Sequence, residues 1–148
     1  MRYAALLLPF LFACGAKETP AVDSTSTTAM AAPALMTEAD VAGSWAGTTM
    51  GLTSDSVLAR WTNVCGAGTC KGSNEGAKDT VVWTYTIAGD SAMGSAAAYA
   101  DPMVKAKITD HWTVHLKDGK VVGTGENRLA SKPDSVVFRY RFEGARKP

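Results

Sequence analysis

The feature that most constrains the fold is a two-residue alternation of apolar and polar side chains. It is clearest in residues 80–87, where Val81, Trp83, Tyr85 and Ile87 fall on one side of an extended segment. Successive side chains of a β-strand point to opposite faces, so this pattern is typical of a strand with one buried face. The same alternation occurs in residues 43–49, 55–62, 104–116, 121–129 and 135–143. The sequence therefore predicts an all-β domain.

Turn signals separate these segments. Asp118-Gly119 favours a type I′ hairpin, because both positions of that turn require positive φ angles. Turns are also predicted at residues 88–90, 101–102 and 132–134, and a Gly-rich, polar loop at residues 65–78. Residues 91–98 are ambiguous, since their alanines suit a helix, whereas Gly94 and the short length favour a weak edge strand.

About seven or eight short strands in consecutive order predict an antiparallel up-and-down meander over residues 37–148. Sheets of this kind avoid exposed edges by curling shut, so we expect a small β-barrel or a strongly curled sheet. Thr37 and Asp40 form a candidate capping box, which predicts a short helical turn before the first strand. An interior of this size holds side chains or one small ligand.

The first strand carries Gly43-Ser44-Trp45, which resembles the Gly-x-Trp motif of the calycins, the group of lipocalins, fatty-acid-binding proteins and avidins. In that family the tryptophan closes one end of the barrel, and an arginine from near the last strand packs over it. The resemblance implies the closing role for Trp45. It offers three candidate arginines, namely Arg139, Arg141 and Arg146. It implies a binding barrel over residues 42–148 and identifies no ligand.

The N-terminal residues have the parts of a secretory signal. Arg2 precedes an apolar run over residues 3–13, and about eleven residues at roughly 1.5 Å each are too few to cross a hydrocarbon core of about 30 Å as a helix. The run ends in Leu11-Phe12-Ala13-Cys14, which resembles a bacterial lipobox. The resemblance implies cleavage before Cys14, a lipid on its sulfur and an acylated amino terminus. The alternative is an ordinary signal peptide that happens to precede a cysteine.

This reading divides the chain into three parts. Residues 1–13 are expected to be a lipoprotein signal peptide, residues 14–36 the lipidated cysteine and a disordered Ala/Thr/Ser/Pro linker, and residues 37–148 the barrel domain. Two or three acyl chains hold a protein stably on a membrane. We therefore expect a cell-envelope protein anchored through its N-terminal lipid. The chain also resembles lipoproteins of diderm bacteria in having Gly15 rather than Asp after the cysteine, and this resemblance implies the outer membrane, facing the periplasm or the cell surface.

Cysteine usage and charge limit the chemistry further. If Cys14 carries lipid, Cys65 and Cys70 remain as an even pair, and an oxidising compartment favours a structural disulfide between them. The formal net charge is +1, so there is no basic footprint for nucleic acid. His111 and His115 share a strand face but lie roughly 13 Å apart, too far for one metal ion. We expect no metal and no cofactor.

Aromatic side chains on the apolar phase of their strands form a candidate ligand cage. The alternative is the packed core of a small domain that is short of Leu and Ile. These side chains are Trp45, Trp61, Trp83, Tyr85 and Trp112.

Asp110 is a candidate site residue because it falls on the apolar face between Ile108 and Trp112. A buried carboxylate is costly unless it is paired. Three explanations remain open. A bulge could turn Asp110 outward, an inward arginine such as Arg60 or Arg128 could pair with it, or it could line a ligand pocket.

No catalytic constellation is recognisable in the sequence. There is no Gly-x-Ser-x-Gly motif and no phosphate-binding fingerprint, and no Ser/His/Asp set has positive support. We therefore expect a non-enzymatic envelope protein that binds a small apolar or amphipathic ligand or serves as an interaction module. The alternative is an envelope enzyme, or an enzyme inhibitor, with a site near Asp110.

Overall fold

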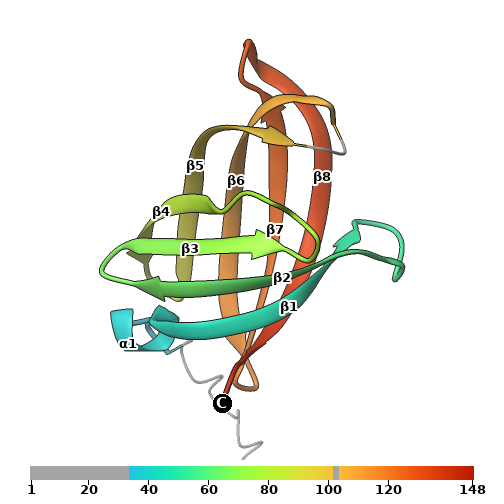
Figure 1. The fold of residues 1–148 in the computed structure, drawn as a ribbon. Helices are drawn as coiled ribbons and strands as arrows, with labels where there is room; N and C mark the ends of the chain where they lie inside the picture. The colour runs from blue at the N-terminus through green and yellow to red at the C-terminus, as the bar shows by residue number, and fades with distance from the viewer. Residues whose placement is uncertain (1–33, 102–103) are drawn as a thin grey trace, which may run out of the picture. The chain divides into compact units, whose positions relative to one another are not determined.

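The computed structural model describes residues 34–101 and 104–148, which form an eight-stranded antiparallel barrel (Figure 1). Its elements follow in chain order as α1 (Glu38–Val41), β1 (Gly43–Gly51), β2 (Val57–Gly66), β3 (Thr69–Asn74), β4 (Val81–Ala88), β5 (Ser91–Asp101), β6 (Ala106–Lys117), β7 (Lys120–Leu129) and β8 (Lys132–Arg146). Each strand pairs with the next, and β8 pairs back onto β1. Closure leaves no free sheet edge. The predicted all-β, up-and-down barrel is confirmed.

The predicted signal segment at residues 1–13, the candidate lipidation site Cys14 and nearly all of the linker lie outside the described residues. Met36, at the end of that linker, is described. Its side chain is buried, and its N–H donates a 2.9 Å hydrogen bond to the carbonyl oxygen of Gly89. No helix among the described residues is long and apolar enough to cross a membrane.

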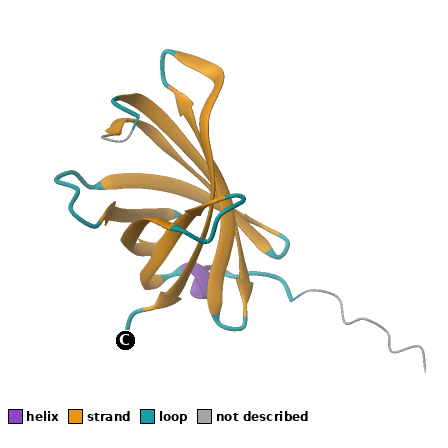
Figure 2. Cartoon of the chain, turned by 90° about the vertical axis from the view of Figure 1, so that its right-hand side faces the viewer, coloured by secondary structure: helices purple, strands orange, loops and turns teal. Residues whose placement is uncertain are grey.

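α1 lies at the end of the barrel where β1 begins and β8 ends (Figures 1 and 2). The Thr37 N–H and hydroxyl both donate to Asp40 Oδ2, at 2.8 and 2.7 Å, so the predicted helical turn is confirmed. The Tyr85 hydroxyl donates to Glu38 and ties α1 to β4. A cluster of buried apolar side chains gathers at this end, namely Met36, Val41, Cys70, Tyr85, Ala92 and Val114. These side chains close this end of the barrel.

Trp45 closes the same end. It is 3% exposed, and its Nε1–H donates a 2.8 Å hydrogen bond to the carbonyl oxygen of Val41. The guanidinium carbon of Arg146 lies 4.6 Å from the centroid of the Trp45 ring. Arg146 also donates to the carbonyl oxygens of Ala39 and Asp40, at 2.7 and 2.9 Å. Of the three candidate arginines, Arg146 holds the position over the tryptophan, so the barrel is compatible with a calycin-like fold.

The loop predicted over residues 65–78 is present only at residues 75–78, after β3, and the rest of the prediction was wrong. β2 continues to Gly66, Ala67 and Gly68 form a tight turn with φ of 51° and 74°, and β3 follows. Cys65 and Cys70 face each other across this hairpin and form the predicted disulfide. β3 shows no apolar alternation because Gly72 occupies one of its inward positions. Pairing with β2 and β4 holds it in place.

Two smaller expectations also change. Residues 91–98 belong to β5, which lies between β4 and β6 rather than at an edge. Its alanines and Gly94 are small because large rings of the neighbouring strands face them: Ala96 pairs with Trp83, and Gly94 with Trp112. The turn expected at residues 132–134 is instead the start of β8.

Candidate ligand-binding site

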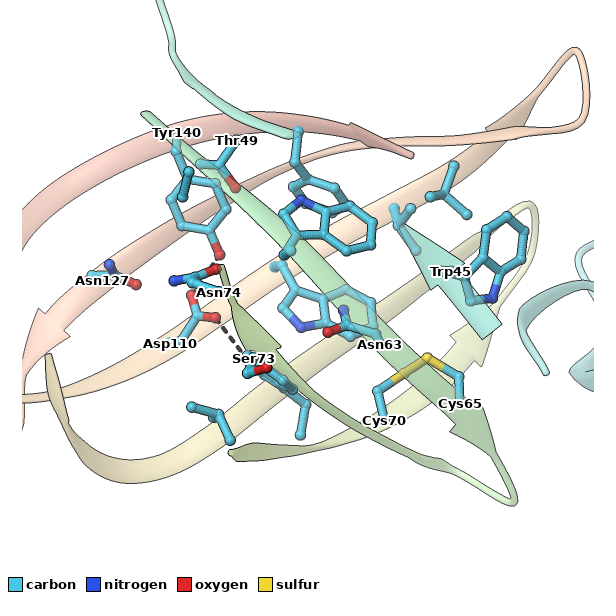
Figure 3. A pocket seen from close by; sticks show the side chains of 18 of the residues that line it. Trp45, Thr49, Asn63, Cys65, Cys70, Ser73, Asn74, Asp110, Asn127 and Tyr140 are labelled. Atoms are coloured by element: carbon cyan, nitrogen blue, oxygen red, sulfur yellow. Dashed lines mark hydrogen bonds between the residues drawn. A yellow bond between two sulfur atoms is a disulfide. The ribbon is translucent and has the colours of Figure 1, made fainter. Parts of the chain in front are cut away.

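The barrel encloses a cavity of about 160 Å³, shown in Figure 3. All eight strands contribute to its wall, mostly through their inward positions, and Val41 and Trp45 lie at its closed end. Aromatic rings make up much of the lining: Trp45, Trp61, Trp83, Tyr99, Trp112, Phe138, Tyr140 and Phe142. The cavity extends to Leu58 and Asn74, which are exposed at the opposite end of the barrel. It is therefore shut near α1 and reaches the surface at the other end.

Glycines keep the interior hollow. Four of the inward rings lie over a glycine that is their direct partner on the adjacent strand, as in the pairs Gly47–Trp61, Gly94–Trp112, Gly123–Phe142 and Gly125–Tyr140. A Cβ atom at Gly125 would lie 2.3 Å from the Tyr140 ring, and one at Gly94 would lie 2.2 Å from the Trp112 ring. Each ring therefore occupies the place of a missing side chain, against the wall. The centre of the barrel stays open.

Asp110 projects into this cavity from β6 and is 5% exposed. Its Oδ2 accepts a 2.8 Å hydrogen bond from Trp83 Nε1–H, and its Oδ1 accepts a 2.6 Å hydrogen bond from the Tyr140 hydroxyl. Figure 3 shows Asp110 and Tyr140 pointing toward each other. Burial raises the pKa of the Asp110 carboxyl; the two hydrogen bonds and nearby His111 oppose that rise without cancelling it.

Two of the three explanations for Asp110 were wrong. It does not turn outward, and it does not pair with an inward arginine: Arg60 lies 4.0 Å from Glu75, and Arg128 pairs with Glu126. The third explanation remains, because Asp110 lies in the wall of a pocket. Whether a ligand binds there stays a prediction.

A bulge does occur beside Asp110, but on the neighbouring strand. Ala96 pairs with Asp110 and Tyr99 pairs with Ile108, so β5 has one residue more than β6 between these pairs. An extra residue shifts the side-chain alternation by one position. Tyr99 and Asp101 consequently line the cavity, although the inward residues earlier in β5 have even numbers.

Tyr99 and Tyr140 complete the surroundings of the carboxylate. Burial raises the pKa of both phenols, and the negative charge of Asp110 raises them further. Asp101 adds to the effect at Tyr99. Both hydroxyls therefore remain protonated at neutral pH. This corner of the cavity is rich in negative charge and aromatic rings.

Five of the six predicted ligand-binding residues line one cavity, namely Trp45, Trp61, Trp83, Asp110 and Trp112. Tyr85 does not. It packs in the apolar cluster near α1, 6.5 Å from Trp112 between ring centroids, and burial together with Glu38 raises its pKa to about 12. The aromatic residues thus serve in part as core and in part as cavity wall.

Sequence reasoning missed two asparagines. Asn63 Oδ1 and Asn127 Oδ1 are buried in the cavity wall, and neither accepts a hydrogen bond from any described residue. Buried polar atoms are nearly always satisfied, so these two oxygens require an explanation. The alternation itself contained the signal, because Asn63 shares the inward phase of Trp61, and Asn127 that of Gly125.

The described residues contain no group of three or more His, Cys, Asp or Glu side chains that could hold a metal ion. Comparison of the chain with protein-family models, with curated proteins and with solved structures finds no match.

Proposed function

We propose that this chain is a lipid-anchored, non-enzymatic protein of the cell envelope, with a calycin-like barrel that holds one small amphipathic ligand. The observation that carries the proposal is the aromatic cavity of about 160 Å³ with a hydrogen-bonded carboxylate in its wall. Ligand sites are typically apolar hollows with a few fixed polar groups, which is the composition found here.

The size of the cavity limits the ligand. An apolar protein cavity of about 150 Å³ accommodates benzene. A compound with a single ring or a short branched chain and one polar group therefore suits this interior. Long acyl chains do not fit within it.

The hydrogen bonds of Asp110 support binding rather than catalysis. Both of its oxygens accept from neutral donors, Trp83 and Tyr140, that are fixed in the barrel wall. No histidine, lysine or arginine is among the described residues that line the cavity, and the raised pKa values of Tyr99 and Tyr140 keep both phenols protonated beside Asp110. The carboxylate is held as a recognition group.

The anchored location rests on the lipobox resemblance around Cys14. The described chain begins next to α1, at the closed end of the barrel, so a tether would join the domain there. The end at which the cavity reaches the surface lies opposite.

Native mass spectrometry of the full-length protein in lipid nanodiscs tests the proposal. We expect a co-purifying small molecule of about ten non-hydrogen atoms, retained under gentle activation. Trp83→Ala, which opens the wall, should lose it. Val82→Ala, which truncates the exposed neighbour on the same strand, should keep it. A bare protein that also takes up none of the small aromatic probes described below would refute the proposal.

A further inference from the structure

The polar groups of the cavity indicate which class of ligand it selects, provided that the proposed binding function holds. Two carboxylates, Asp101 and Asp110, belong to the lining, and no lysine, arginine or histidine does in the part of the chain that the structure describes. Asp101 accepts a 2.8 Å hydrogen bond from the N–H of Val104, and Asp110 is the less exposed of the two, at 5% against 9%.

Asp110 and Asn127 are direct cross-strand partners on β6 and β7. Their side chains share the inner face, and the Cβ atoms of such partners lie about 4.5–5.5 Å apart. Asn127 is 7% exposed, and its Oδ1 accepts no hydrogen bond from any described residue. A carboxylate and an unsatisfied amide oxygen are thus adjacent at one point of the cavity wall.

This pair has spare acceptor capacity. A carboxylate offers about four lone-pair sites; Trp83 and Tyr140 each supply one hydrogen bond to it, and the backbone N–H of His111 supplies another. No ion pair of the described residues involves Asp110. A buried carboxylate without an opposite charge is unfavourable, so the site is suited to a ligand that brings a positive charge and N–H donors.

The rings around the pair suit the same ligand. Tyr140 and Phe138 stack on one side, with ring centroids 6.1 Å apart, and Tyr99 lines the cavity as well. Aromatic faces attract organic cations, most strongly where water is excluded. Trp61, Trp83 and Trp112 then surround the space left for an apolar body.

We propose that the cavity selects a small primary or secondary ammonium compound, whose N–H groups donate to Asp110 and to Asn127 Oδ1 while its apolar part lies among the tryptophans. Carboxylates and plain hydrocarbons of the same size lack one or both of these interactions. Asp110 and Asn127 are therefore specificity-determining residues of the site.

The test uses three probes of nearly equal size: benzylamine, which is cationic at neutral pH, benzyl alcohol, which is neutral, and benzoate, which is anionic. Each is titrated by calorimetry into the full-length protein in nanodiscs, with empty nanodiscs as the baseline. We expect benzylamine to bind at least about tenfold more tightly than benzyl alcohol, as one charge-assisted hydrogen bond would give. Benzoate should bind most weakly.

Three variants test whether Asp110 and Asn127 cause the preference for benzylamine over benzyl alcohol. Asp110→Asn should reduce the ratio of benzylamine to benzyl alcohol affinity to near one, and Asn127→Leu should reduce it several-fold. Asp134→Asn removes the same charge from an exposed position in β8 and should leave the ratio unchanged.

The outcomes separate the two proposals. If benzyl alcohol binds as tightly as benzylamine to the unmodified protein, the ammonium inference is wrong and the binding barrel stands. If no probe binds to protein that mass spectrometry shows to be bare, both proposals are wrong. Because the unmodified protein decides these two results, a variant that fails to fold does not obscure them.

Discussion

The Tyr140 hydroxyl donates a 2.6 Å hydrogen bond to Asp110 Oδ1 from β8, one strand beyond the direct partner of Asp110 on β7. The bond therefore crosses the inside of the wall instead of following the strand pairing. Gly125 permits it, because Gly125 pairs with Tyr140 and leaves room for the ring to lie over β7. The position of the carboxylate depends on this contact and on Trp83.

Tyr140→Phe removes that contact and leaves one oxygen of a buried carboxylate without its donor. We expect the free energy of unfolding to fall by about 1–3 kcal/mol, measured by urea denaturation at pH 7. Tyr99→Phe is the control, since the Tyr99 hydroxyl makes no hydrogen bond to another described residue. Equal losses in the two variants would contradict the account.

Asp110 should also impose a pH dependence on stability. Burial raises its pKa in the folded chain above the ordinary value of about 3.9. Between the two values the folded state holds the proton and the unfolded state has released it, so stability falls as pH rises. The difference in unfolding free energy, Asp110→Asn minus unmodified protein, should therefore increase from about pH 4 toward neutrality.

Both proteins contain the other titratable groups near this site, namely His111 on the outer face and Asp101, Tyr99 and Tyr140 within the cavity. Subtracting the two unfolding free energies therefore isolates the pH dependence that Asp110 causes. The exposed Asp134→Asn variant should show no such trend. A flat difference for Asp110→Asn would mean that its carboxyl is not desolvated in the folded protein.

Gly125→Ala tests the origin of the hollow interior. The added Cβ would meet the Tyr140 ring at 2.3 Å, so the ring must move into the cavity or the strands must separate. Overpacking of this kind costs about 1–3 kcal/mol. Gly66→Ala, where a Cβ meets nothing within 4 Å, should change stability by less than about 1 kcal/mol. Thermal unfolding of both variants provides the comparison.

Reduction of the Cys65–Cys70 bond should destabilise the hairpin between β2 and β3. The chain-entropy estimate for so short a loop is about 2 kcal/mol. A double Cys65→Ala, Cys70→Ala variant should therefore unfold at lower urea concentration than the oxidised protein. The same reducing agent should have no effect on the double variant, which separates loss of the bond from other effects of the reagent.

The alternation was sufficient to predict the barrel, because nearly every strand has one buried face. It failed at β3, where Gly72 replaces an inward side chain: Asn63 Oδ1 would lie 1.7 Å from a Cβ at that position. The glycine is there to admit a side chain of the neighbouring strand, and such a requirement is not visible in a one-dimensional pattern.

The site was predictable only in part. Inward phase correctly brought Asp110 and four tryptophans to one cavity. It could not foresee that the bulge beside Asp110 would belong to β5, nor that Tyr99 and Asp101 would consequently line the interior. The position of the bulge and the inward direction of these two side chains both depend on the register between β5 and β6. That register follows from side-chain packing, which the sequence pattern alone does not show. The alternation predicts that Asn63 and Asn127 face inward. Only the closed barrel shows that their side-chain oxygens are buried.

The lipid anchor is tested separately from the barrel. Cells expressing the full-length chain should incorporate labelled palmitate into it, and Cys14→Ser should abolish the incorporation, because the lipobox resemblance places the lipid on that sulfur. Cys65→Ala, Cys70→Ala should retain the label. Equal labelling of the Cys14→Ser variant would contradict the lipobox assignment.

The central claim is that a small molecule enters the barrel, and the four tryptophans report on it directly because all of them line the cavity. The most direct measurement is ¹⁹F NMR of the full-length protein labelled with 5-fluorotryptophan, in nanodiscs, during titration with benzylamine. We expect saturable shifts of the Trp61, Trp83 and Trp112 signals, each assigned by a Trp→Phe variant. If these three signals stay unchanged with benzylamine and, in a second titration, with benzyl alcohol, in protein that mass spectrometry shows to carry no other small molecule, the proposed function is wrong.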